Sequence, residues 1–257
     1  KGEILMKLYD LTQKIGVSTP PWPTYEPLEM KYFKRLSTER VNGQIIKTSN
    51  HIGTHLDGER HFWTAGRDMA SIPLEDLFGE GVIVDLSDAV EDYDIYTSEM
   101  IEERVDVKEG DILIINTGYH KYGWDQPEAD EERYFMKHPG PNMEFAFWAM
   151  EKKLKWIGVD CGSADHPMNT VCKKLRPDLA EEAEEHLGAP LDEVFSHPES
   201  RQLMHTKLFP EGIIHAENIG GEIDELLNQR VKIGFFPWKG VDLESSIGRC
   251  VAFVDEE

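Results

Sequence analysis

The chain has 257 residues, 40% of them hydrophobic and 30% charged, which is the composition of a folded globular protein rather than a disordered or fibrous one. Its formal net charge of −22 at pH 7 repels phosphate backbones and anionic bilayers, so neither nucleic acid nor a membrane is an expected partner. The apolar runs are far shorter than the ~20 residues of a membrane helix, and the three cysteines include no CxxC pair. We therefore expect a cytoplasmic protein that has neither a disulfide framework nor a cysteine-based zinc site.

Short β-type runs alternate with turns along the chain, and helical patterns gather in its middle. The predicted strands cover 3–11, 43–52, 81–86, 111–118, 155–160, 231–238 and 249–254, and the predicted helices cover 97–105, 142–154, 179–187 and 222–229. Thr97 and Asn142 have the side chains of helix N-caps. Strands and helices do not alternate strictly, so the pattern predicts a mixed α/β fold. Since no repeat or linker marks a boundary, we expect a single domain over 1–257.

Two acidic, proline-containing segments, 124–141 and 176–200, interrupt this pattern. Long loops on enzymes often face the substrate, but solvated surface or an oligomer contact would give the same composition. Residues 1–11 lack the charged, then apolar, then small-residue pattern of a signal peptide. Because residue 1 is not Met, the sequence does not decide whether a segment precedes it.

The stretch HIGTHLDGERHF, residues 51–62, concentrates ligand-type side chains. His51, His55 and Asp57 share one face of an extended strand, but at ~3.3 Å per residue a straight strand separates His51 from Asp57 by about 20 Å. Gly53 is the residue that can bend the chain and bring them together. Two imidazoles and a carboxylate with open positions suit a catalytic Zn²⁺, Mn²⁺ or Fe²⁺. His61 remains as a free side chain beside the ion.

Other residues near this site stay open as candidates. Asp160 or Asp165 could support a ligand histidine through a hydrogen bond or could simply cap a turn. His215 lies two residues before Glu217 and is a reserve ligand. Trp22 and Trp63 could form an aromatic wall for a substrate, although large aromatic residues are more often part of the core.

Two other classes of function fit part of the pattern. A non-haem iron oxygenase would use His55, Asp57 and His205 as its two-histidine, one-carboxylate triad, but this leaves three residues unexplained, His51, His61 and Glu217. The other class is a metal-binding protein without catalytic activity.

Several stretches of the chain resemble the metal-dependent, cyclase-type hydrolases, the family of bacterial kynurenine formamidase and isatin hydrolase. HIGTHLDGERHF resembles the signature HxGTHxDxxxHF of this family. The similarity extends over most of the chain, through YDLTQKIGVSTPPWPTYEP, EGDILIINTGY, IGVDCGSADHP and HTKLFPEGIIHAENIGG.

The resemblance implies a swivelling β/β/α domain that forms a homodimer or homotetramer. It also implies one or two divalent metal ions as the cofactor, with Zn²⁺ the first choice and Mn²⁺ the alternative. It implies His51, His55 and Asp57 as ligands of one ion, with His205 and Glu217 completing a second ion site that Asp57 bridges. It also implies His61 as the catalytic histidine that moves a proton during hydrolysis of a small-molecule amide such as N-formylkynurenine. An ester or lactone is the alternative substrate.

The chain departs from the formamidase pattern at one place. Gly58, Glu59 and Arg60 replace the Ala-Pro step, which by sequence puts two charges beside the site.

Overall fold

The structure, a computed structural model, describes residues 5–256, so the start of the strand predicted over 3–11 lies outside the described part. Its main sheet contains β1 (Leu5–Asp10), β4 (His55–Asp57), β5 (Phe78–Asp85), β7 (Ile112–Asn116), β9 (Trp156–Val159), β10 (Ile214–Glu217), β11 (Gln229–Pro237) and β12 (Ser245–Glu256). Two small pairs are β2 (Glu29–Lys34) with β3 (Gly43–Lys47), and β6 (Ile95–Tyr96) with β8 (Gly140–Pro141).

Short helices connect these strands. The α-helices are α1 (Leu36–Glu39), α2 (Leu74–Leu77), α3 (Ser98–Glu102), α4 (Met143–Glu151), α5 (Cys172–Leu175), α6 (Pro177–Leu187), α7 (Leu191–Val194) and α8 (Leu203–Thr206). Single turns of 3₁₀-helix cover Glu59–His61, Tyr119–Tyr122, Pro167–Asn169, Phe209–Glu211 and Ile223–Leu226, and a π-helix covers Arg133–Lys137. The predicted mixed α/β class is confirmed.

The main sheet closes on itself. Its strand order is β1-β12-β11-β5-β7-β9-β10-β4, and the first residues of the long strand β12 also pair with β4. β5, β7, β9 and β10 run parallel to one another, whereas the other pairs are antiparallel. As a result β4 is the strand that completes the closure between β10 and β12.

Strand β7 shows why the sheet has apolar layers on both faces. Its sequence ILIIN is continuously apolar up to the final Asn, as expected for a strand buried on both sides. Because successive side chains of a strand point to opposite faces, Leu113 and Ile115 join one core with α3 and α4, and Ile112 and Ile114 join the other core inside the closed sheet.

The predicted strands are confirmed, except that the strand predicted over 43–52 ends at Lys47, and the helices over 97–105, 142–154 and 179–187 are confirmed as well. Thr97 and Asn142 accept hydrogen bonds from the first turns of α3 and α4, as N-caps do. The prediction of a helix over 222–229 is wrong, because only a single turn of 3₁₀-helix, Ile223–Leu226, forms there. Asn228 has a left-handed φ of 57° there, because the chain must turn before it enters β11.

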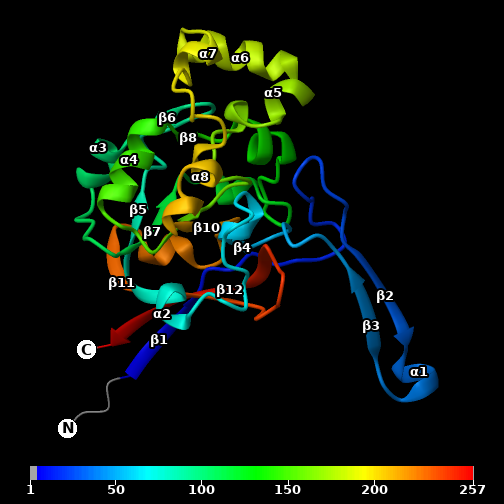
Figure 1. The fold of residues 1–257 in the computed structure, drawn as a ribbon. Helices are drawn as coiled ribbons and strands as arrows, with labels where there is room; N and C mark the ends of the chain where they lie inside the picture. The colour runs from blue at the N-terminus through cyan, green and yellow to red at the C-terminus, as the bar shows by residue number, and fades with distance from the viewer. Residues whose placement is uncertain (1–4, 257) are drawn as a thin grey trace.

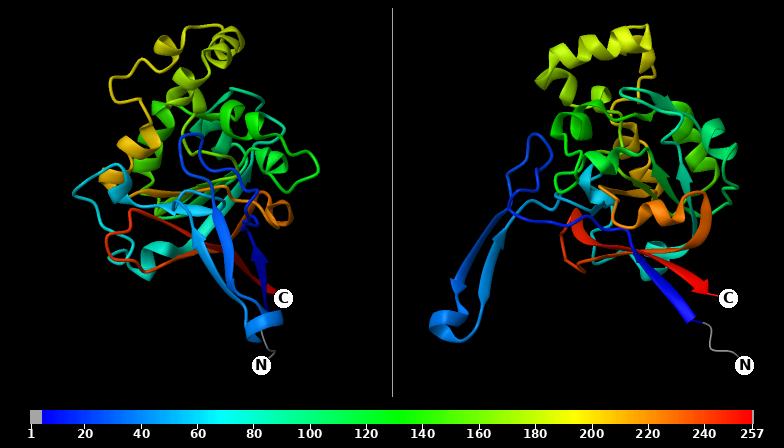
Figure 2. Two further views of the ribbon diagram at one scale, coloured as in Figure 1. Left: turned by 90° about the vertical axis from the view of Figure 1, so that its right-hand side faces the viewer. Right: turned by 180° about the vertical axis from the view of Figure 1, so that it is seen from behind.

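Two parts stand apart from the closed sheet. Among residues 5–256, β2 and β3 pair only with each other, and with α1 at their tip they project from the body (Figure 1 and Figure 2). Helices α5, α6 and α7 form a layer at the end of the molecule far from the two termini (Figure 1) and bury a small core of their own. The acidic segment 176–200 belongs mostly to this layer. Within the described residues no helix is both long and apolar enough to cross a bilayer.

Candidate metal centre and active site

The register of strand β4 against strand β10 assembles the centre of the site. In this antiparallel pair His55 lies opposite Glu217, and Asp57 lies opposite His215. All four side chains are almost completely buried. Because alternate residues of a strand share a face, the pairing of two short strands brings two imidazoles and two carboxylates to one point.

Gly53 makes the bend that joins His51 to this group. Its φ of +56° lies in the left-handed region, which glycine enters without steric cost. Following the bend, the backbone carbonyl of Gly53 holds His55 Nδ1 at 2.8 Å, which leaves His55 Nε2 directed toward Asp57 at 3.4 Å. His51 Nδ1 lies 2.9 Å from the same carboxylate oxygen, Asp57 Oδ1. The bend expected from sequence at Gly53 is confirmed.

The second oxygen of Asp57 faces a different set of donors. His205 Nε2 lies 3.6 Å and His215 Nε2 3.5 Å from Asp57 Oδ2, and His215 Nε2 is also 3.6 Å from Glu217 Oε1. Asp57, His205, His215 and Glu217 can therefore all direct one atom each to a common point. Asp57 stands between two groups of ligands.

The donor set fits divalent metal ions. Asp57 Oδ1 has His51 Nδ1 beside it, but His55 Nε2, Asp57 Oδ2 and His215 Nε2 are buried without a hydrogen-bond partner among the described residues. Buried polar atoms are nearly always paired, so these three unpaired atoms fit the ligands of a metal ion. Imidazole and carboxylate ligands suit Zn²⁺, Mn²⁺ or Fe²⁺.

Two of the histidines carry protons when no ion is present. Burial opposes the charge on His51, but Asp57 and Glu244 outweigh it and raise the pKa of His51 to about 10. In the same way burial opposes the charge on His205, whereas Asp165 and Asp57 raise its pKa to about 10. These protons supply the positive charge that the buried carboxylates need, and a bound cation would displace them.

His55, His215 and Glu217 are neutral near pH 7. Burial lowers the pKa of His55 and of His215 to about 4, which leaves both imidazoles able to bind a metal. Burial, together with the charge of Asp57, raises the pKa of Glu217 to about 8. A cation in the centre would reverse this last shift by favouring the carboxylate.

Neighbouring groups fix the orientation of the ligands. Asp165 Oδ2 lies 2.6 Å from His205 Nδ1, so of the two candidate aspartates Asp165 is the one that contacts a candidate ligand histidine. The backbone N–H of Ala164 donates to Glu217 Oε1 at 2.8 Å. Asp160, the other candidate, instead accepts hydrogen bonds from Thr117 at the end of β7.

His61 lies at the edge of the centre and shares a carboxylate with His51. Glu244 Oε2 is 2.8 Å from His61 Nδ1 and 2.9 Å from His51 Nε2. Burial opposes ionisation of Glu244, but these two histidines outweigh it and lower its pKa to about 2. Sequence analysis missed Glu244, because a single Glu before a strand carries no motif.

A small cavity opens onto the ligands. Its wall contains Trp22, Tyr25, Phe62 and Gln202 together with His61 and four of the candidate ligands, His51, Asp57, His205 and Glu217. Burial and the charge of Asp57 raise the pKa of Tyr25 to about 12, so its hydroxyl keeps its proton. Trp63 does not line this cavity; the neighbouring Phe62 does, with its ring 4.6 Å from that of His205.

The two charges expected beside the site point away from it. Glu59 is buried and forms an ion pair with Arg67 at 2.6 Å, and Arg60 pairs with Asp242 at 2.7 Å. Residues 59–61 form a 3₁₀ turn, in which Glu59 is buried and Arg60 lies in an exposed ion pair, while of the three only His61 lines the cavity. The sequence interpretation of these two residues is therefore wrong.

The closed mixed sheet is a fold that solved hydrolases share. The chain superposes on isatin hydrolase A from Ralstonia solanacearum with a TM-score of 0.77, covering 97% of this chain and 92% of that one, at 18% sequence identity. At this identity the likeness establishes the fold.

Sequence comparisons place the chain within a family. The family model described as "Putative cyclase" matches residues 9–166, more than half of the chain, and the protein belongs to this family. The matched range contains the ligands of the 51–57 stretch and ends before His205.

Two curated relatives show how far the similarity extends. "Cyclase-like protein 1" of Arabidopsis thaliana is 30% identical over 169 residues, which is 60% of this chain and 61% of the plant protein. The kynurenine formamidase of Erythrobacter litoralis is 25% identical over 197 residues, 76% of this chain and 83% of that protein. The match thus spans less than two thirds of the plant relative.

Proposed function

We propose that the protein is a metal-dependent hydrolase that cleaves a C–N amide bond. One observation carries the proposal: the unpaired, buried donors of His55, Asp57 and His215 converge, and His61 stands beside them with its own carboxylate partner. The formamidase and isatin hydrolase relatives support the same class of reaction.

Two groups of candidate ligands support the binding of two divalent ions. Zn²⁺ is the first choice for these ions, and Mn²⁺ is the alternative. His51, His55 and Asp57 would hold the first, and Asp57, His205, His215 and Glu217 the second. A bound divalent cation supplies Lewis-acid polarisation of a carbonyl oxygen and lowers the pKa of water near neutrality.

His61 is the proposed general acid and base. Glu244 holds Nδ1, so Nε2 is the atom free to take a proton from the attacking water and return it to the leaving nitrogen. The charge of Glu244 also stabilises the imidazolium that forms between these two transfers. Glu244 therefore acts as a positioning residue that links His61 to the ligand His51.

The cavity wall favours a flat, aromatic amide. Its lining includes the aromatic side chains of Trp22 and Phe62 and the polar side chains of Tyr25 and Gln202, which suit such a substrate. N-formylkynurenine and related linear or cyclic amides have this shape, and esters or lactones of similar size are the alternative.

A hydrolysis screen tests the proposal. The Zn²⁺- or Mn²⁺-loaded protein is offered N-formylkynurenine, isatin, cyclic imides, carbamates and lactones, with Asp57→Asn as the inactive control. Turnover of an amide that is lost in Asp57→Asn supports the proposal. Turnover of lactones alone would select the alternative, and no turnover with metal bound would contradict both.

The remaining expectations belong to the same proposal. We propose that the chain works as one domain in the cytoplasm and acts on a small molecule.

A further inference from the structure

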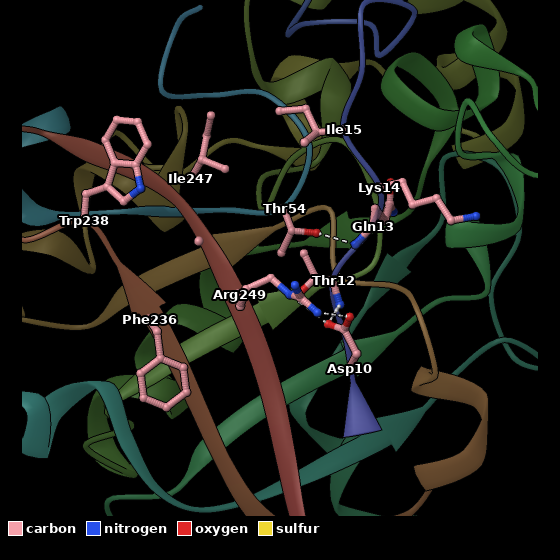
Figure 3. Close-up of a pocket in the computed structure, with 11 residues that line it drawn as sticks. Asp10, Thr12, Gln13, Lys14, Ile15, Thr54, Phe236, Trp238, Ile247 and Arg249 are labelled. Carbon is pink, nitrogen blue, oxygen red and sulfur yellow. Dashed lines mark hydrogen bonds and ion pairs between the residues drawn. The ribbon is translucent and has the colours of Figure 1, made fainter. Parts of the chain in front are cut away.

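Gln13 joins the two chain segments that carry the candidate metal ligands. Its backbone N–H donates to Thr54 Oγ1 at 2.9 Å, and Thr54 Oγ1 donates in turn to the backbone carbonyl of Asn218 at 2.5 Å. Figure 3, a close-up of a groove that Gln13 also lines, shows its bond to Thr54. Thr54 directly precedes His55, and Asn218 directly follows Glu217. Gln13 therefore holds both ligand-bearing segments at one point.

The side chain of Gln13 is fixed in place, but its amide oxygen is unpaired. Nε2 donates to Tyr134 Oη at 2.8 Å and to the carbonyl of Ile219 at 3.3 Å, and because a carbonyl only accepts, these bonds assign the nitrogen. Oε1 accepts no hydrogen bond within residues 5–256, although Gln13 is only 9% exposed. An amide oxygen in such a place needs a donor from outside the chain.

Gln13 borders a polar pocket of about 250 Å³. The side chains that matter for its chemistry are those of Gln13, His120, Lys121, Gln126, Glu128 and Asp224. A Cβ atom at Gly123 would lie 3.4 Å from Gln13 Oε1 and 3.7 Å from Gln126 Cγ. The unpaired oxygen thus lies toward the turn that forms one wall of the pocket.

The charged side chains of the pocket indicate which group it takes. The Asp224 carboxylate, 67% exposed, lies 3.3 Å from His120 Nε2, and Glu128 forms no ion pair among the described residues. Lys121 is exposed beside them, with its ammonium over the ring of Tyr122. Two carboxylates and an amide oxygen are acceptors, so the pocket suits a positively charged ligand that carries several N–H donors.

We propose that this pocket is a second ligand site, separate from the metal centre, and that it binds a primary ammonium group. Gln13 Oε1, Asp224 and Glu128 are the acceptors, and an ammonium group offers three donors. Simple amines and free amino acids both carry this group. In an amino acid, the carboxylate would be the partner of Lys121.

Occupation of the pocket reaches the metal centre through Gln13. A donor bound to Oε1 restrains the residue whose side chain holds Ile219 and whose backbone holds Thr54. The two ligand-bearing segments should then open less often. The inference goes beyond the proposed function and does not depend on it, because neither ligand binding nor amide exchange requires hydrolysis.

Calorimetric titration of the metal-loaded full chain with propylamine and with L-alanine tests the site. We expect binding of the ammonium group, and we expect Asp224→Asn and Glu128→Gln each to weaken it at least about fivefold. Asp192→Asn, which changes an exposed carboxylate on α7, is the matched control and should bind like the wild type. Circular dichroism verifies that each variant is folded. Tighter binding of L-alanine would identify an amino acid as the ligand, and tighter binding of propylamine a simple amine.

Tetramethylammonium separates hydrogen bonding from charge, because it carries the charge without an N–H donor. We expect it not to bind. Three results would overturn the proposal: equal binding of tetramethylammonium, no binding of either ammonium compound, or binding that both pocket variants retain in full. In the last case the ligand would occupy another place, such as the metal ion.

Amide hydrogen exchange followed by mass spectrometry tests the link through Gln13. With saturating propylamine or L-alanine, we expect exchange to slow about threefold in peptides that cover 50–57 and 214–222, and to stay unchanged over 29–47. At the same ligand concentration the slowing should be smaller in Glu128→Gln. Unchanged exchange in both peptides of the wild type with ligand bound would overturn the coupling to the metal centre.

Discussion

Asp57 and His215 face each other across the β4–β10 ladder, and His215 Nε2 lies 3.5 Å from Asp57 Oδ2. Neither nitrogen of this fully buried imidazole has a hydrogen-bond partner among the described residues. His215 is therefore a stronger candidate ligand than the sequence alone indicated.

Replacing His215 by Ala should remove one ligand from the second ion and leave the first group intact. We expect the metal content, measured by mass spectrometry after dialysis, to fall from two ions per chain toward one. His197→Ala changes an exposed histidine that belongs to none of the candidate ligand groups and should keep both ions. Unchanged metal content in His215→Ala would exclude His215 as a ligand.

Replacing His61 by Ala should separate catalysis from metal binding. Since His61 Nδ1 bonds Glu244, we expect the metal content to persist while kcat falls by roughly 10²- to 10⁴-fold. Loss of an ion in this variant would instead make His61 a ligand.

Glu244→Gln should test the positioning role of that carboxylate. The amide keeps the size of the side chain but no longer stabilises a charged His61, so we expect kcat to fall roughly 10- to 100-fold with KM little changed. Asp242→Asn, two residues away in an exposed ion pair with Arg60, is the control and should retain wild-type kcat. An equal loss in both variants would point to a general effect on this loop.

Metal binding should release protons. The pKa of about 10 at both His51 and His205 means that both imidazoles are protonated at pH 7 without an ion, and each must lose its proton to bind one. The apparent affinity should therefore rise with pH, by about tenfold per pH unit for each proton released. Calorimetry in buffers of different ionisation enthalpy measures this number, and a value of zero would contradict the assigned protonation.

The contact between His120 and Asp160 should make stability depend on pH. His120 Nδ1 lies 3.0 Å from Asp160 Oδ2, and although burial opposes the charge, Asp160 and Asp224 raise the pKa of His120. A histidine whose pKa is raised in the folded state stabilises the fold fully at a pH below its pKa in the unfolded chain, about 6.5. This stabilisation is lost as the pH rises through the pKa of the folded state. In metal-free protein the free energy of unfolding by urea, wild type minus His120→Asn, should be largest near pH 6 and shrink toward pH 9. A difference independent of pH would mean that His120 contributes only packing.

Local pattern was enough to predict most of the scaffold. ILIIN gave a buried strand and Asn142 an N-cap because burial on both faces and capping are written in neighbouring residues. The helix expected over 222–229 failed because the turn at Asn228 is imposed by the start of β11, which the local pattern does not contain.

For the site, the sequence by itself determined the stretch of candidate ligands and the bend within it. His51, His55 and Asp57 are close along the chain, and Gly53 is the residue that can turn between them, so short-range geometry was sufficient. Their joining to His205 and Glu217 came from a resemblance to a family.

Only the tertiary structure decided which remote groups complete the site. Glu244 meets His51 from 193 residues away, and His215 meets Asp57 through the register of two strands. The tertiary structure also pairs Glu59 with Arg67, and it leaves the β2–β3 hairpin projecting from the body. These facts depend on strand pairing and on which buried charge finds which partner, and no local propensity encodes either.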